Sequence, residues 1–216
     1  MSTSGSMTPY RWGALAFMVG SVLFLVNKLD EISARVFGRP MPDVISGDDT
    51  LLILIGQIVF SIGFVTFYLY YAPRTTRAGR VALALVAAGG VLTMLGHITF
   101  MRVLERSGPI RDLFMKTGFD PFFIVILGGL LLLAGLIGLG VLNWRQPIMG
   151  RWRWLPLATA AALLGFFMSG GEVITVRLLF FRTLFALGLI GLGFVMWRDS
   201  GEPNVPEPVT AVPATV

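Results

Sequence analysis

Six long apolar segments dominate this chain of 216 residues, and their length constrains the fold more than any other feature of the sequence. A helix that crosses a bilayer needs about 20 largely apolar residues. The segments that meet or approach this length cover residues 9–27, 51–72, 81–104, 120–144, 154–170 and 178–197. We therefore expect an all-α integral membrane protein with six transmembrane helices, of which the fifth is short.

The composition excludes the main alternatives to a membrane protein. Of all residues, 55% are hydrophobic and 13% are charged, whereas a soluble domain carries about 25% charged residues. The chain cannot supply the polar surface of a water-soluble fold, and it is too apolar for a disordered protein. The sequence contains no cysteine, which excludes disulfide scaffolds, thiol catalysis and cysteine-ligated metal centres.

The rest of the chain consists of connections and a tail. In residues 28–37 and 107–116, apolar and charged side chains recur at helical spacing, which predicts short helices lying on the outer membrane surface. Residues 200–216 combine four prolines with Ser, Gly and Glu, a composition typical of disorder. We expect a transmembrane domain over residues 1–199 and a disordered cytoplasmic tail over 200–216.

Net positive charge is distributed unequally between the two sides of the predicted bundle: one side carries eight basic and three acidic residues, and the other carries nine of each. Because cytoplasmic connections carry an excess of Lys and Arg, we place both termini in the cytoplasm and expect anionic lipid, not nucleic acid, at this face. Two Lys against fifteen Arg indicate a GC-rich genome, and we expect the plasma membrane of a bacterium. The eight arginines on this side are Arg11, Arg74, Arg77, Arg80, Arg145, Arg151, Arg153 and Arg198, and its acids are the tail residues Asp199, Glu202 and Glu207.

The fourth and sixth segments end in nearly the same sequence. Residues 136–140 with Trp144 and Arg145 recur 53 positions later as residues 189–193 with Trp197 and Arg198. This internal repeat indicates three tandem helical hairpins. Convergence is the alternative, since any helix that ends at the cytoplasmic side tends to finish in an aromatic residue and an arginine. The glycines within it, predicted to be helix-packing positions because small residues allow close approach in lipid, are Gly138, Gly140, Gly191 and Gly193.

His97 is the only histidine and lies within the third segment. Met94, His97 and Met101 share one helical face, where they offer a weak candidate site for a soft metal or a haem. The simpler interpretation is a histidine bonded to a neighbouring helix, with methionines filling gaps. We expect no cofactor and no metal.

A group of polar residues at the outer side forms the main candidate site. Arg182 lies inside the sixth segment, where a guanidinium either reaches the surface or pairs with a carboxylate that faces the bundle interior. The group serves either as an ion-pair lock between helices or as a pocket for an anionic or polar solute. Its predicted members are Arg182, Arg177, Glu172, Asp120, Glu105, Arg102 and Gln57.

No motif in the sequence indicates catalysis, so we expect the protein not to be an enzyme. The favoured interpretation is an accessory or structural membrane subunit that packs against other membrane subunits. The first alternative is a small-solute carrier, or the substrate-binding component of one. In size and topology alone, the chain resembles the vitamin-binding components of energy-coupling transporters. The second alternative is an intramembrane redox or metal protein that uses His97.

Overall fold

The computed structural model describes residues 8–26, 38, 51–100, 121–169 and 176–201. This part of the chain is helical and contains no strand. The expected surface helices of residues 28–37 and 107–116 and the tail beyond residue 201 lie outside the described residues. The helices are α1 (Pro9–Val26), α4 (Leu51–Tyr71), α5 (Arg77–Phe100), α8 (Pro121–Arg145), α9 (Leu155–Phe167) and α10 (Val176–Asp199), with short 3₁₀ turns η1 (Ala72–Arg74) and η2 (Gly150–Trp152).

Five of the six described α-helices are long and apolar enough to cross a membrane, which confirms the predicted fold class. They are α1, α4, α5, α8 and α10. Helix α9 has 13 residues and so falls short of the about 20 that a spanning helix needs. It begins at Leu155 with Pro156 in its first turn, where the missing N–H of proline costs no helix hydrogen bond.

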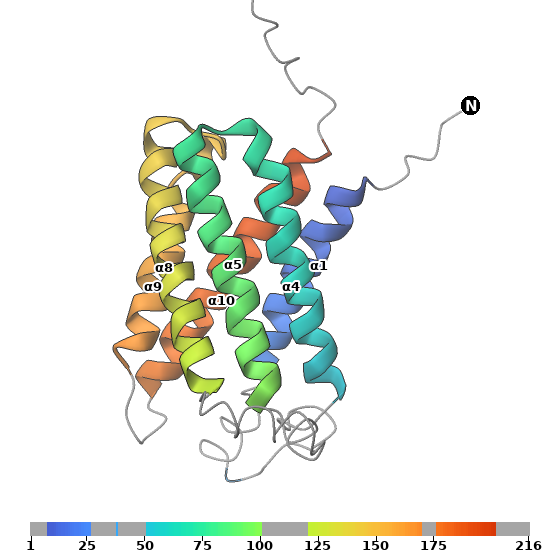
Figure 1. Ribbon diagram of the computed structural model, residues 1–216, viewed down its shortest axis with the longest axis vertical. Coiled ribbons are helices and arrows are strands. Elements are labelled where there is room, and N and C mark those ends of the chain that lie inside the picture. Colours follow the sequence, from blue (N-terminus) through green and yellow to red (C-terminus); the bar gives the residue numbers. More distant parts are fainter. Residues whose placement is uncertain (1–7, 27–37, 39–50, 101–120, 170–175, 202–216) are drawn as a thin grey trace, which may run out of the picture.

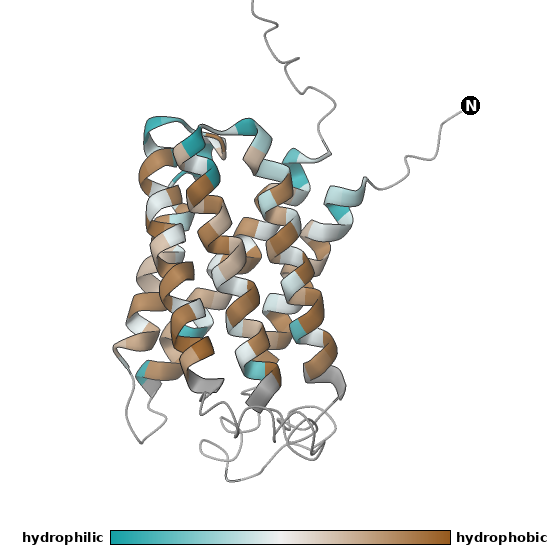
Figure 2. Cartoon of the chain, in the orientation of Figure 1, coloured by the Kyte–Doolittle hydropathy of each residue, from teal (hydrophilic) through white to brown (hydrophobic). Residues whose placement is uncertain are grey.

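The six helices form a closed ring in which each packs mainly against two neighbours, with a smaller contact between α4 and α10. Around the ring the order is α1, α4, α5, α8, α9 and α10, and α10 returns to α1. Figure 1 shows α1 beginning and α10 ending at the end of the bundle where α4 connects to α5 and α8 to α9. We call this end, which carries the eight arginines named above, the arginine-rich end. Figure 2 shows apolar residues along the lengths of the helices and polar residues gathered at this end.

Aromatic side chains fill the space between α1 and α4. The ring of Phe17 lies 4.8 Å from that of Phe64 and 5.6 Å from those of Phe60 and Phe67. Phe67 continues the contact to Tyr71, 5.0 Å away at the arginine-rich end. Because all five side chains are at most 1% exposed, they form a packed apolar column along most of this helix pair.

Glycine brings α5 and α8 into backbone contact. A Cβ at Gly135 would lie 2.6 Å from the backbone nitrogen of Val86, and one at Gly128 would lie 2.5 Å from that of Thr93. Non-bonded carbon and nitrogen atoms do not approach each other this closely, so only glycine fits at these two positions. Such close packing replaces the hydrophobic drive that helices lack in lipid.

Candidate functional site

Arg182 is the one charged side chain that is buried among the described residues, with 6% of its surface exposed. It lies on α10, five residues beyond the exposed Arg177, which is about 7.5 Å deeper along the helix axis. Its placement agrees with the predicted inward orientation. A cation buried at this depth is costly unless neighbouring groups compensate for its lost hydration.

Helix α1 supplies two compensating interactions. Arg182 Nη2 donates a hydrogen bond of 2.8 Å to the backbone carbonyl oxygen of Phe24, and its guanidinium carbon lies 4.1 Å from the centre of the Phe24 ring. Phe24 is in the last turn of α1, the end of a helix at which a cation is favoured by the helix dipole. The planar guanidinium can stack on the ring and donate to the carbonyl at once, whereas a lysine ammonium lacks this geometry.

Gln57 is the second buried polar side chain in this region. It is 4% exposed, and its Oε1 accepts no hydrogen bond from the described residues. Phe60 and Phe185 lie one turn further along α4 and α10, and their rings are 6.2 and 6.1 Å from that of Phe24. Gln57 and Arg182 therefore lie one turn beyond the same aromatic contact, on the side away from the arginine-rich end.

The other predicted members of this group are not brought together by the described structure. Arg177 is exposed at the start of α10. The acids Glu172, Asp120 and Glu105, together with Arg102, lie outside the described residues. The expected pairing of Arg182 with an acid stays a prediction, and the carbonyl of Phe24 is a partner that the sequence did not indicate.

Helix α5 carries the weak candidate for a metal site. Met94 is 3% exposed and His97 is half-buried, while Met101 lies outside the described residues. No group of three or more His, Asp or Glu side chains suited to a metal ion occurs in the part of the chain that the structure describes. His97 is not without an interaction partner.

The four glycines predicted to pack helices meet different neighbours. A Cβ at Gly193 would lie 2.8 Å from Met18 Cγ on α1, and one at Gly140 would overlap Leu157 of α9. A Cβ at Gly191 would lie 3.0 Å from a methyl group of Leu155, and one at Gly138 would lie 3.4 Å from the Cβ of Ala82. Gly138 thus has room for a methyl group, although the sequence grouped it with the other three.

A polar network at the arginine-rich end was missed in the sequence. The hydroxyl of Tyr71 donates a hydrogen bond of 3.1 Å to Asp199, which also forms a 2.7 Å ion pair with Arg198. Tyr71 is 1% exposed, so this bond links the end of α4 to the end of α10. The sequence shows Asp199 only as a tail residue, and the 128 positions between Tyr71 and Asp199 hid the contact.

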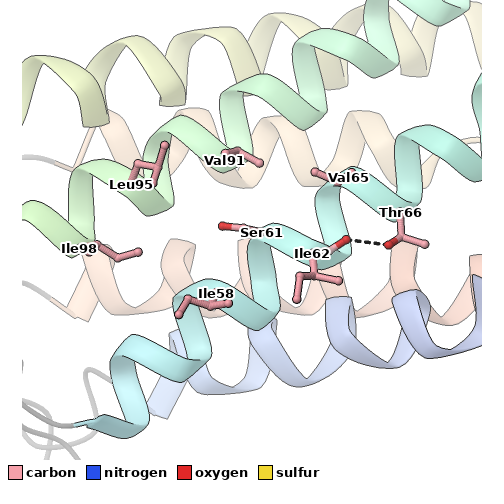
Figure 3. A pocket seen from close by; sticks show the side chains of 8 residues that line it. All are labelled: Ile58, Ser61, Ile62, Val65, Thr66, Val91, Leu95 and Ile98. Atoms are coloured by element: carbon pink, nitrogen blue, oxygen red, sulfur yellow. Dashed lines mark hydrogen bonds between the residues drawn. The ribbon is translucent and has the colours of Figure 1, made fainter. Parts of the chain in front are cut away.

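An apolar groove of about 370 Å³ lies between α4 and α5 (Figure 3). The hydroxyls of Ser61 and Thr66 line it, but Ser61 donates to the carbonyl of Gln57 at 2.9 Å and Thr66 to that of Ile62 at 2.8 Å. Their hydrogen-bonding protons are therefore engaged within α4. The remaining lining is aliphatic: Ile58, Ile62, Val65, Val91, Leu95 and Ile98.

Comparison with known proteins does not add a function to this geometry. No protein-family model, no curated protein and no solved structure matches the chain.

Proposed function

We propose that this protein is a non-catalytic integral-membrane subunit that accompanies other membrane proteins. The observation that best supports this role is the filled interior between α1 and α4. From the 6.2 Å contact of Phe24 with Phe60 to the 5.0 Å contact of Phe67 with Tyr71, aromatic rings follow one another along the helix pair. A carrier needs polar groups along its path, and this stretch offers aromatic surface instead.

The position of Arg182 also favours a structural role. Its hydrogen bond and ring contact hold the beginning of α10 against the end of α1, and this contact closes the ring of helices. A guanidinium used in this way orders two helices that are far apart in sequence.

Site-specific photo-crosslinking in native membranes tests the accessory role. A photoreactive amino acid is introduced singly at three exposed positions on different helices, Val22 of α1, Leu127 of α8 and Leu187 of α10, with the buried Leu136 as the matched control. An accessory subunit is expected to crosslink to one defined protein from one face of the ring. That crosslink should be lost when a neighbouring exposed residue is replaced by tryptophan. Lipid adducts alone from all three faces would contradict the proposal.

A solute carrier is the second candidate, and one observation favours it. Gln57 and Arg182 are both buried, on two helices that contact α1, one turn beyond the Phe24 contact. The buried Oε1 of Gln57 accepts no hydrogen bond from the described residues, and a solute with a donor group would supply one. Uptake into proteoliposomes that contain only this protein, lost in Gln57→Leu and retained in Ser61→Ala, would favour the carrier over the accessory subunit.

A further inference from the structure

The eight arginines of the arginine-rich end differ in whether they have a partner among the described residues. The side chains of Arg77 and Arg145 are exposed and make no hydrogen bond, ion pair or ring contact with the described residues. The other six are engaged. Arg11, Arg74, Arg151 and Arg153 lie over aromatic rings, Arg80 donates to the carbonyl of Ala72, and Arg198 pairs with Asp199.

The packing of α5 against α8 brings the two remaining arginines to the same height. Gly135 of α8 lies against Val86 of α5, and these helices run in opposite directions. Nine residues from this contact toward the arginine-rich end, α5 has reached Arg77 and α8 has reached Trp144, so these two residues lie at the same height. Arg145 is the residue after Trp144. Two cations therefore lie at the same height on the outward faces of adjacent helices.

Both arginines also continue exposed apolar faces. Residues at intervals of three or four share one face of a helix. On α5 these are Val81, which is 57% exposed, and the exposed Ala84 and Ala88. On α8 they are Val141, Ile137 and Leu130, which are 46%, 44% and 54% exposed.

We infer that Arg77 and Arg145 bind the phosphate of one anionic phospholipid whose acyl chains lie on the exposed faces of α5 and α8. Guanidinium groups donate paired hydrogen bonds to phosphate oxygens, and a phosphate offsets the repulsion between two cations at the same height. The apolar faces directly beside them suit acyl chains, which a soluble phosphate lacks. This site is independent of whether the protein is an accessory subunit or a carrier.

Native mass spectrometry of the detergent-solubilised protein tests this site. Dissociation constants are measured for dioleoyl phosphatidylglycerol and dioleoyl phosphatidylcholine, which share their acyl chains. We expect a preference for the anionic lipid of about 30-fold, since each arginine near a membrane surface contributes about fivefold in affinity. The double variant Arg77→Gln/Arg145→Gln should lose most of this preference. The control Arg11→Gln/Arg74→Gln, which removes the same charge from engaged arginines, should keep it.

Three outcomes would overturn the inference. The Arg77/Arg145 variant could keep the preference of the native protein, or the control could lose as much, which would indicate a general attraction to the surface. Inorganic phosphate could displace phosphatidylglycerol at millimolar concentration, which would indicate a phosphate site without lipid specificity. Because both arginines are exposed, the variant is expected to fold, and its melting temperature in phosphatidylcholine checks this.

Discussion

Arg182 Nη2 lies 2.8 Å from the carbonyl oxygen of Phe24, and this bond joins the first and last helices of the ring. The two residues are 158 positions apart, so the contact holds together the two ends of the membrane domain. The carbonyl belongs to the last turn of α1, where a cation is favoured by the helix dipole.

The first prediction compares the two arginines of α10. Arg182→Leu should lower the free energy of unfolding by about 1.5–3 kcal/mol, since a hydrogen bond that involves a charged group contributes about that much. Arg177→Leu should change it by less than about 1 kcal/mol, because Arg177 is exposed. Unfolding in mixed micelles with increasing SDS measures both values. Equal effects of the two substitutions would show that Arg182 does not hold α1 and α10 together.

The second prediction separates two glycines of α8. Gly138→Ala should leave stability unchanged or raise it by up to about 1 kcal/mol, since a Cβ there meets only Ala82 at 3.4 Å and alanine favours helix. Gly135→Ala should lower stability by about 1–3 kcal/mol, because its methyl group would lie 2.6 Å from the backbone of Val86. Thermal melting of both variants in one detergent decides the matter. A stabilising Gly135→Ala would contradict the α5–α8 packing.

How far the sequence predicts this fold depends on the range of the interactions involved. Hydropathy over windows of about 20 residues is a local property, and it located all five helices that are long enough to span. The predicted fifth segment ends at residue 170, three residues beyond the observed end of α9 at Phe167. Helix boundaries also depend on capping and packing, which hydropathy does not describe. The amphipathic segments outside the described residues stay predictions.

The candidate site was less predictable because its contacts join distant segments. The inward orientation of Arg182 could be predicted locally, because an arginine within an apolar segment stands out in the sequence. Its acceptor is a backbone carbonyl of Phe24, and backbone groups occur at every residue, so no side-chain pattern could single this one out. Gly138 shows the same limit, because its sequence motif equals that of Gly191 but its neighbour differs. Gly138 faces the small Ala82 of α5, whereas Gly191 faces the larger Leu155 of α9.

The third prediction concerns the hydroxyl of Tyr71. Tyr71→Phe should lower stability by about 1.5–3 kcal/mol, because it removes the 3.1 Å hydrogen bond to the Asp199 carboxylate. Tyr68→Phe is the matched control, since Tyr68 is only half-buried on the same helix. Chemical unfolding of both variants measures the difference. An unchanged Tyr71→Phe variant would show that this bond does not stabilise the ends of α4 and α10.

The fourth prediction concerns the orientation in the membrane. Cysteines at Thr76 and Arg151, both exposed at the arginine-rich end, should be protected from a membrane-impermeant thiol reagent in intact cells, whereas one at Ser46 should react. Met149 lies in the same connection as Arg151 but is 0% exposed. A cysteine at Met149 would therefore be protected on either side of the membrane. Labelling of Thr76→Cys and Arg151→Cys with protection of Ser46→Cys would invert the predicted topology.

We propose that aromatic packing closes the interior to solutes, and the reactivity of a cysteine at Ser21 tests this closure. Ser21 is 0% exposed on α1, and its hydroxyl donates to the carbonyl of Phe17 at 2.7 Å. Ser21→Cys changes one atom, and the chain has no other cysteine. The packed interior predicts no reaction with a small, charged methanethiosulfonate reagent in native membranes and full reaction after unfolding in SDS. Rapid reaction in the folded protein would reveal a water-filled path beside Phe17 and would show that the interior is open to solutes.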